Sequence, residues 1–298
     1  MLKVKVPATT ANMGPGFDSM GMALTMYNIV YAEQIESGLE IIVKSGNPSI
    51  PTDETNLIYQ TIKDFYEHIE KEVPGIRLIQ QDSIPHTRGL GSSAACIVAG
   101  LCIANALSES YFSNDELALM ATKIEGHPDN VVPALLGGMV VSVTTDEQIY
   151  HNKVDIDEGI SFAVMIPDFT LSTELARKAL PSEVSIKDAV FNASRTALLA
   201  TSLMTGNLDN IEVAVQDALH QNYRSPLIPN MNEILEKAKE FGAKGSYLSG
   251  AGPTLMAIVK NKTDFRKKMA EYLDTLDVKW EIKMLQADNT GVEVTVED

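Results

Sequence analysis

The chain has 298 residues, of which 45% are hydrophobic and 21% are charged. This length exceeds one ordinary hydrophobic core and suits two domains, and the composition excludes a disordered, collagen-like or coiled-coil protein. Lys and Arg number 24 and Asp and Glu number 40, so the formal net charge is −16. The balance argues against a general nucleic-acid binder, but backbone amides can still hold an anionic small molecule.

We expect a cytoplasmic protein in a reducing compartment. The N-terminal sequence MLKVKVPATT lacks the long apolar core of a signal peptide. The most apolar run, residues 94–107, is shorter than the roughly 20 residues that span a bilayer. Cys96 and Cys102 lie in this helical pattern with their thiols turned roughly 120° apart, so no disulfide between them is expected.

The first half of the chain predicts strands and helices in succession. Residues 2–6 alternate apolar and lysine side chains as a strand does, and apolar runs at 23–35 and 39–43 predict two more strands. Apolar residues at helical spacing predict an amphipathic helix over 55–71. The other elements expected here are a strand at 76–81, helices at 93–107 and from the capping box at Ser113 to Glu125, and a strand at 139–144.

The second half begins after a polar segment, residues 146–159, which predicts loops at a domain boundary. We therefore predict domains at 1–155 and 156–298. Strands and helices are interspersed without strict βαβ alternation, so the pattern favours an α+β fold over a doubly wound sheet. The elements expected are strands at 161–166, 246–248, 255–259, 280–286 and 292–296, and helices at 187–204, 208–219, 232–241 and 264–273.

The strongest motif is Pro-His-Thr-Arg-Gly-Leu-Gly-Ser-Ser-Ala-Ala at residues 85–95, directly before an apolar helix. Free backbone amides and the helix dipole favour negative charge at such a helix N-terminus, and the small side chains let a polyphosphate approach. The motif is not a P-loop, which would need a Gly-Lys-Ser/Thr ending, and it is not a Rossmann turn, which would need a third glycine. The alternative is a tight loop that only caps a buried helix.

Two further glycine loops follow strands, Ala-Asn-Met-Gly-Pro-Gly-Phe-Asp at 11–18 and Ser-Gly-Ala-Gly-Pro-Thr at 249–254. Together the three loops resemble the GHMP kinase family, whose central motif Pro-x-x-x-Gly-Leu-Gly-Ser-Ser-Ala-Ala is matched at every fixed position. The segments that resemble the homoserine kinases within that family are residues 7–18, 125–134, 171–177 and 217–224.

This resemblance implies both a fold and a reaction. The fold would be a ribosomal protein S5 domain 2-like N-terminal domain and a ferredoxin-like C-terminal domain, with the site between them. The reaction would be magnesium-assisted transfer of phosphate from ATP to the hydroxyl of L-homoserine, in threonine biosynthesis. The resemblance also implies a homodimer, and no nucleic-acid or membrane partner is expected.

The resemblance places the ATP phosphates on the central motif. The residues implied are Pro85, Arg88, Gly89, Leu90, Gly91, Ser92, Ser93, Ala94 and Ala95, with Asn56 a candidate beside adenine. Magnesium is implied at Glu125 with the hydroxyl of Ser92 or Ser93, and the choice between the two serines stays open. A cation bound to phosphates takes one or two protein oxygens, which fits. The alternative for Glu125 is a solvated helix end, where a negative charge is mildly unfavourable.

An amino-acid zwitterion needs an acid for its ammonium group and cations for its carboxylate. Asp18 resembles the family's ammonium ligand, and Arg177 and Arg224 resemble its carboxylate ligands, a task that suits the planar guanidinium fork. The alternative is a set of ordinary salt bridges. The other residues that the resemblance places in the substrate pocket are Asn12, His127, Asp129, Asn130, Thr173 and Gly252.

The residues expected to act in catalysis are Asn130, Glu125 and Ser93, with Asn130 contacting the attacking hydroxyl and the γ-phosphate. His127 is a candidate general base because its ordinary pKa is near neutrality. The resemblance instead implies direct attack without a base. Asp129 either belongs to the pocket or only caps a turn.

Two other functions remain open from the sequence. A mevalonate or diphosphocytidyl-methylerythritol kinase would share the loops, but its substrate has no ammonium group to explain Asp18. An inactive ligand sensor on the same fold would have damaged phosphate or metal positions, and here these positions are intact.

Overall fold

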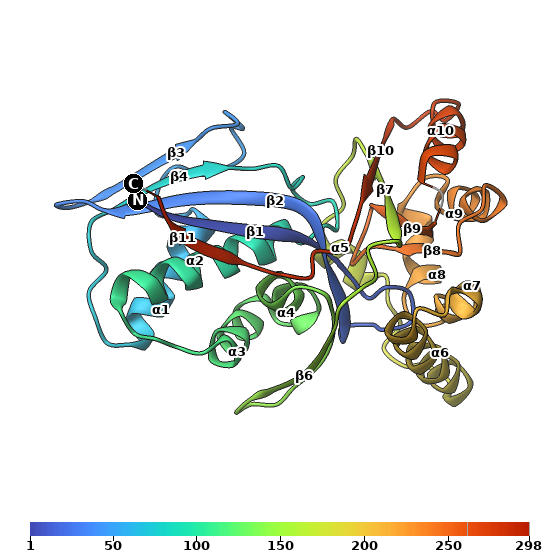
Figure 1. The fold of residues 1–298 in the computed structure, drawn as a ribbon, viewed down its shortest axis with the longest axis horizontal. Coiled ribbons are helices and arrows are strands. Elements are labelled where there is room, and N and C mark those ends of the chain that lie inside the picture. The colour runs from blue at the N-terminus through green and yellow to red at the C-terminus, as the bar shows by residue number, and fades with distance from the viewer. Residues whose placement is uncertain (261, 298) are drawn as a thin grey trace.

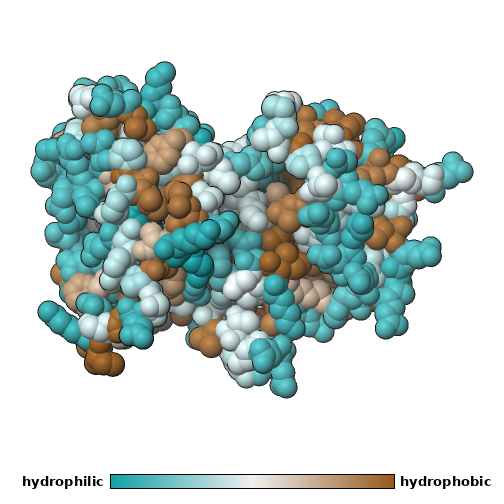
Figure 2. Space-filling model, turned by 180° about the vertical axis from the view of Figure 1, so that it is seen from behind, coloured by the Kyte–Doolittle hydropathy of each residue, from teal (hydrophilic) through white to brown (hydrophobic). Residues whose placement is uncertain are grey.

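The computed structural model describes residues 1–260 and 262–297, and it contains two sheets at opposite ends of an elongated molecule (Figure 1). The two chain ends lie together on the first sheet, where the Met1 ammonium group donates a hydrogen bond to the Glu297 carbonyl over 2.7 Å. Seen from behind, the molecule has two lobes with a notch between them at the upper edge, and hydrophilic atoms cover most of this face (Figure 2).

The first sheet runs in the order β11-β1-β2-β4-β3, with β5 on β2 and β6 on β5. Its ladders are antiparallel except for the parallel pair β3 and β4. Its strands are β1 (Leu2–Ala11), β2 (Met20–Gln34), β3 (Leu39–Val43), β4 (Ile76–Gln81), β5 (Met139–Thr144), β6 (Ile149–Val154) and β11 (Glu293–Val296). One face of this sheet is covered by α1 (Leu57–His68), α2 (Ser92–Ser108), α3 (Asn114–Glu125) and α4 (Pro128–Leu136) (Figure 1).

The central helix of this layer, α2, is buried on nearly every side, which is why its sequence is apolar all round. Gly100 sits in its interior against α1. A Cβ atom there would lie 2.8 Å from the carbonyl oxygen of Ile58 and 2.7 Å from the Cβ of Thr61. The glycine therefore lets the two helices approach closely, although glycine disfavours a helix interior.

The second sheet has the order β10-β7-β9-β8 and antiparallel ladders throughout. Its strands are β7 (Ser161–Pro167), β8 (Gly245–Leu248), β9 (Leu255–Val259) and β10 (Trp280–Leu285). The helices of this half are α5 (Thr173–Lys178), α6 (Ile186–Thr205), α7 (Ile211–Ala214), α8 (Gln221–Arg224), α9 (Met231–Glu240) and α10 (Lys262–Leu273), with 3-10 turns at Leu208–Asn210 and Ser225–Leu227.

The α+β interpretation is confirmed, and most predicted elements are present within two or three residues of their expected ends. Three predictions were wrong. The first strand, expected at 2–6, continues through Pro7 to Ala11, with a β-bulge between Pro7 and Ala8. The polar segment 146–159 contains strand β6, which within the described residues pairs with β5 alone. The helix predicted over 208–219 ends at Ala214, since the carboxylate of Asp217 accepts the backbone N–H groups of Leu219, His220 and Gln221.

The chain returns to the first sheet after β10. Ala287 forms a bridge with Leu24, and β11 then pairs with β1. The division into domains at 1–155 and 156–298 stays a prediction, and residues 293–296 lie in the first sheet.

Cys96 and Cys102 are free thiols, and burial raises the pKa of each to about 12. Within residues 1–260 and 262–297, no helix combines the length and the apolar character that a membrane span requires.

Candidate active site

The three glycine loops, far apart in the sequence, meet at the N-terminal end of α2. Gly250 donates its backbone N–H to the carbonyl of Ala11 over 3.0 Å, which joins the last loop to the first. The hydroxyl of Ser249 donates to the carbonyl of Gly89 over 2.6 Å, which joins the last loop to the central one. The backbone N–H of Thr9, near the end of β1, donates to the carbonyl of Leu90 in the central loop over 3.1 Å.

Two of these glycines are required by the closeness of the loops. Gly91, the N-cap of α2, has φ 69°, and a Cβ atom there would lie 1.9 Å from the hydroxyl of Thr9. Gly89 has φ 74°, and its Cβ atom would lie 2.5 Å from the carbonyl oxygen of Ser249. Any other residue would combine an unfavourable backbone conformation with a collision.

The first turn of α2 has no side-chain cap and no acidic residue. Its orphan N–H groups and the positive end of the helix dipole therefore face a cavity of about 280 Å³, which Gly89, Gly91, Ser92 and Ser93 help to line. This end of the cavity is suited to an anion.

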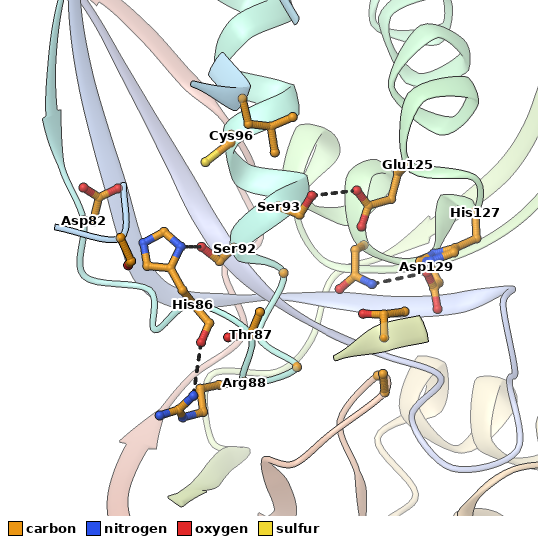
Figure 3. Close-up of a pocket in the computed structure, with 18 of the residues that line it drawn as sticks. Asp82, His86, Thr87, Arg88, Ser92, Ser93, Cys96, Glu125, His127 and Asp129 are labelled. Carbon is orange, nitrogen blue, oxygen red and sulfur yellow. Dashed lines mark hydrogen bonds and ion pairs between the residues drawn. The ribbon is translucent and has the colours of Figure 1, made fainter. Parts of the chain in front are cut away.

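The two serines of the motif point to different partners, as Figure 3 shows. Ser93 donates its hydroxyl to Glu125 Oε2 over 3.0 Å, whereas Ser92 Oγ lies 3.2 Å from His86 Nδ1. Glu125 is the last residue of α3, and burial raises the pKa of its carboxyl. The carboxylate and hydroxyl oxygens of Glu125 and Ser93 form a donor set that suits a hard divalent cation.

The opposite wall carries the charges expected for an amino-acid pocket. Arg177 on α5 donates to both oxygens of Asp18 over 3.0 and 3.1 Å. Arg224 is only 2% exposed, and it donates to the carbonyl of Gly250 over 2.9 Å. Burial and the nearby charge of Arg177 lower the pKa of Arg224 to about 10. Both guanidinium groups lie against the ring of Phe17, 5.7 and 5.4 Å from its centroid.

Asp129 is the hub of a small hydrogen-bond network at the start of α4. It is 2% exposed and accepts from Nδ1 of His127 over 2.6 Å and from the amide of Asn130 over 3.3 Å. The Thr9 hydroxyl donates to the side-chain Oδ1 of Asn130 over 2.7 Å, so the Asn130 amide is fixed in one orientation. One ligand atom from each of Asp18, His127 and Asp129 lies within 4.8 Å of the others.

The cavity brings together most of the residues predicted from the sequence. The predicted residues that line it are Asn12, Asp18, Asn56, Arg88, Gly89, Gly91, Ser92, Ser93, Glu125, His127, Asp129, Asn130, Thr173, Arg177 and Arg224. Those that are not among its lining residues are Pro85, Leu90, Ala94, Ala95 and Gly252. From the last glycine loop, Gly250 and Ala251 reach the cavity instead.

The polar side-chain atoms of Asn56 and Arg88 form hydrogen bonds with other parts of the protein. The side-chain carbonyl of Asn56 caps α1 by accepting from Ile58 and Tyr59, and its amide donates to Pro51. The Arg88 guanidinium donates to backbone carbonyls, among them Pro167 and Asp168 at 3.0 Å each. Their predicted contacts with ATP stay predictions.

Sequence reasoning missed several residues of this site. Phe17 carried a signal, because it stands beside Asp18 in the first glycine loop. His86 carried one too, since it lies inside the central motif at a position that the family pattern leaves free. Nothing in the sequence marked Asp82 or Cys96 as site residues, and only the fold brings them to the cavity wall.

Comparison with known proteins gives a consistent result across the chain. The model of the GHMP kinase N-terminal domain matches residues 56–138, and that of the GHMP kinase C-terminal domain matches residues 197–275. Homoserine kinase of Caldicellulosiruptor saccharolyticus is 46% identical over 297 residues, which cover 99% of this chain and 96% of that protein. Homoserine kinase of Clostridium beijerinckii is 47% identical, covering 99% and 98%.

A solved structure agrees with these relatives. The crystal structure of homoserine kinase from Cytophaga hutchinsonii superimposes with a TM-score of 0.88 at 27% identity, covering 99% of this chain and 97% of that one.

The pair of His127 and Asp129 predicts a pH dependence of stability. Burial lowers the pKa of His127, but the hydrogen bond and the charge of Asp129 raise it by more. The pKa therefore lies above the ordinary value of 6.5. The charged imidazolium therefore stabilises the fold below about pH 6.5, and this contribution is lost as the pH rises through the folded-state pKa. In urea unfolding, the free energy of unfolding of the wild type should exceed that of His127→Gln by on the order of 1 kcal/mol near pH 5.5, and by less near pH 9.

His68→Gln is the matched control, because His68 is exposed on α1. Its stability difference from the wild type should not change with pH in this way. A His127 proton resonance that titrates at or below pH 6.5 in the folded protein would contradict the assignment.

Proposed function

The chain belongs to the GHMP kinase family and lies among its homoserine kinases, and on that premise we propose how its residues carry out the reaction. The protein catalyses the ATP-dependent phosphorylation of L-homoserine to O-phospho-L-homoserine, a step of threonine biosynthesis. The observation that carries the assignment of residues is that one cavity joins an uncapped helix N-terminus to a pocket with an acid and two guanidinium groups.

The triphosphate binds at the first turn of α2. The backbone N–H groups of Gly91, Ser92 and Ser93 donate to it, and the close approach depends on the lack of side chains at Gly89 and Gly91. Arg88 acts indirectly, because its hydrogen bonds to Pro167 and Asp168 hold the central loop against β7.

Glu125 and Ser93 would hold magnesium, and we choose Ser93 over Ser92 because Ser93 contacts Glu125 whereas Ser92 contacts His86. Burial disfavours an unpaired negative charge on the Glu125 carboxylate. A cation bound beside this carboxylate would compensate for that cost. When bound, the metal would neutralise part of the phosphate charge.

L-Homoserine binds as a zwitterion beside the phosphate end. Its ammonium group contacts Asp18, with Asp129 and Asn12 nearby, and its carboxylate contacts Arg177 and Arg224. Asp18 and Arg177 are paired with each other in the structure, so substrate binding replaces one ion pair by two. The nearby Arg224 guanidinium, held by Gly250, gives the carboxylate a fixed second partner.

Asn130 aligns the side-chain hydroxyl of homoserine with the γ-phosphate. Its amide is fixed by Thr9 and Asp129, so it can orient the hydroxyl without reorganising. We propose direct attack: the homoserine oxygen bonds to the γ-phosphorus, the bond to the β-phosphate oxygen breaks, and the proton passes to a phosphate oxygen. His127 positions Asp129 through its Nδ1 and does not act as the base, because the raised pKa of His127 favours the imidazolium form, which has no free lone pair to accept a proton.

The predicted homodimer and the cytoplasmic location stay predictions.

The substrate assignment is tested by a coupled assay of ADP release. We expect turnover with L-homoserine and none with mevalonate, which has no ammonium group for Asp18. Arg177→Gln should raise the KM for homoserine roughly 10- to 1,000-fold, because one charged carboxylate contact is lost, and leave the KM for ATP within about twofold. Folding should be preserved, since the Arg177 side chain is 45% exposed.

Lys178→Gln is the matched control for Arg177→Gln. Lys178 is the next residue of α5, and its only ion pair among the described residues is the exposed one with Glu174. Equal losses of affinity for both substrates in Arg177→Gln would show that the arginine only supports the fold.

The metal assignment predicts different effects for the two serines. Ser93→Ala and Glu125→Gln should each lower kcat/KM on the order of 10- to 100-fold and raise the Mg²⁺ concentration for half-maximal rate, because each removes a metal ligand. Ser92→Ala should leave that Mg²⁺ concentration unchanged. A Mg²⁺ titration that shifts for Ser92→Ala and not for Ser93→Ala would reverse the assignment.

A further inference from the structure

One fully buried histidine, His220, has no part in the assignments above. It is the N-cap residue of α8, is 0% exposed and is not among the residues that line the cavity. Both of its ring nitrogens nevertheless have close polar neighbours. Nε2 lies 2.7 Å from the carbonyl oxygen of Gly14, and Nδ1 lies 3.2 Å from Nη1 of Arg224. The histidine therefore joins the first glycine loop to a guanidinium group of the substrate pocket.

The two neighbours determine where the ring proton resides. A carbonyl oxygen only accepts hydrogen bonds, so Nε2 must carry a proton to bond with Gly14. A guanidinium group only donates, so Nδ1 must keep its lone pair to bond with Arg224. One neutral tautomer satisfies both contacts. Burial lowers the pKa of His220, which agrees with a neutral ring.

Asp217 is the other candidate partner of the ring, since its Oδ2 lies 3.7 Å from Nε2 of His220. That distance is too long for a hydrogen bond. The carboxylate also has other donors, because it accepts from the side-chain amide of Asn192 and from the backbone N–H groups of residues 219–221. A charged imidazolium would moreover direct an Nδ1 proton at the cationic Arg224. The ring is therefore neutral, and its Nδ1 accepts from Arg224.

The N–H groups of Arg224 are divided between the protein and the cavity. Nη1 contacts Nδ1 of His220 over 3.2 Å and the carbonyl of Gly250 over 2.9 Å, and Nε donates to the carbonyl of Ala176 over 3.3 Å. Nη2 has no hydrogen-bond partner within the described residues, and Arg224 lines the cavity. A guanidinium group has five N–H bonds, so these three contacts leave the two on Nη2 for a ligand.

His220 also connects the two charged walls of the substrate pocket. Its ring stacks on that of Phe17, with centroids 5.3 Å apart, and Phe17 stands beside Asp18 in the loop that contains Gly14. The guanidinium group of Arg224 lies 5.4 Å from the centroid of the same Phe17 ring. Without the Nδ1 acceptor, one Nη1 proton would be buried without a partner, which favours a turned guanidinium group.

We propose that His220 is a positioning residue for carboxylate recognition: its neutral imidazole accepts from Nη1 of Arg224 and thereby directs Nη2 toward the carboxylate of the substrate. This role rests on the proposed function, in which Arg177 and Arg224 bind the carboxylate of L-homoserine. His220 itself touches no substrate.

The test uses two substitutions that each keep one of the two contacts. In His220→Asn, the side-chain carbonyl can occupy the place of Nδ1, so the acceptor for Arg224 is kept and the donor to Gly14 is lost. In His220→Gln, the terminal amide can occupy the place of Nε2, so the donor to Gly14 is kept and the acceptor for Arg224 is lost.

We expect His220→Gln to raise the KM for L-homoserine roughly tenfold or more, because a hydrogen bond to a charged group is lost. Its kcat and its KM for ATP should stay within about twofold of the wild type. For His220→Asn, all three constants should stay within about threefold. If the role were only structural, His220→Asn, which has the shorter side chain, would be at least as damaging as His220→Gln, and that result would overturn the proposal.

L-Homoserine amide shows whether the effect passes through Arg224, because a neutral amide there replaces the carboxylate. Its inhibition constant against L-homoserine should rise no more than about threefold in His220→Gln, since an amide gains less than an anion from a positioned guanidinium group. Equal weakening of L-homoserine and its amide would overturn the proposal.

The wild type offers a test that does not depend on whether a variant folds. In nitrogen NMR near neutral pH, the imidazole of His220 should carry its proton on Nε2, both with and without L-homoserine. A proton on Nδ1 would overturn the proposal, because that nitrogen could then not accept from Arg224. Failure of the wild type to phosphorylate L-homoserine would instead contradict the proposed function, with the tautomer of His220 unchanged.

Discussion

The close approach of three glycine loops is the constraint on which the rest of the site depends. The loop after β1, the loop before α2 and the loop between β8 and β9 touch through backbone atoms, at distances that a Cβ on Gly89 or Gly91 would make impossible. Because the loops come from both sheets, this contact also fixes how the two halves of the chain meet. The uncapped first turn of α2 is exposed to the cavity only because the loops around it carry no bulk.

The proposed site would let an acidic protein hold a polyanion through local charge. The chain has a formal net charge of −16, yet in the proposed complex the phosphates meet backbone N–H groups, and the substrate carboxylate meets two arginines beside Phe17. Of the acidic residues in the cavity, Asp18 and Asp129 lie together near His127, and Glu125 lies beside Ser93 at the first turn of α2. Asp18 and Arg177 are paired with each other in the structure, and in the proposed complex each of them faces the opposite charge of the zwitterion.

Much of the fold and many of the site residues could be predicted from the sequence, for physical reasons that vary by element. The motif at 85–95 and the apolar run after it are local signals, so α2 and the glycine turn at its N-terminus were predictable. The end of α7 at Ala214 was not, because apolar spacing does not show that the Asp217 side chain, inside the predicted helix, accepts the backbone N–H groups after it. The partners of Ser92 and Ser93 depend on where His86 and Glu125 lie in space, so the sequence left the serine choice open. Asp82 is a similar case, since only strand β4 brings it to the cavity.

The most direct measurement is a crystal structure of the protein with L-homoserine and a non-hydrolysable ATP analogue. The account predicts that the γ-phosphate contacts the backbone amides of residues 91–93, with the homoserine hydroxyl between it and Asn130. It also predicts the ammonium group at Asp18 and the carboxylate at Arg177 and Arg224. A triphosphate bound away from the first turn of α2, or a homoserine molecule turned so that its carboxylate faces that turn, would contradict it.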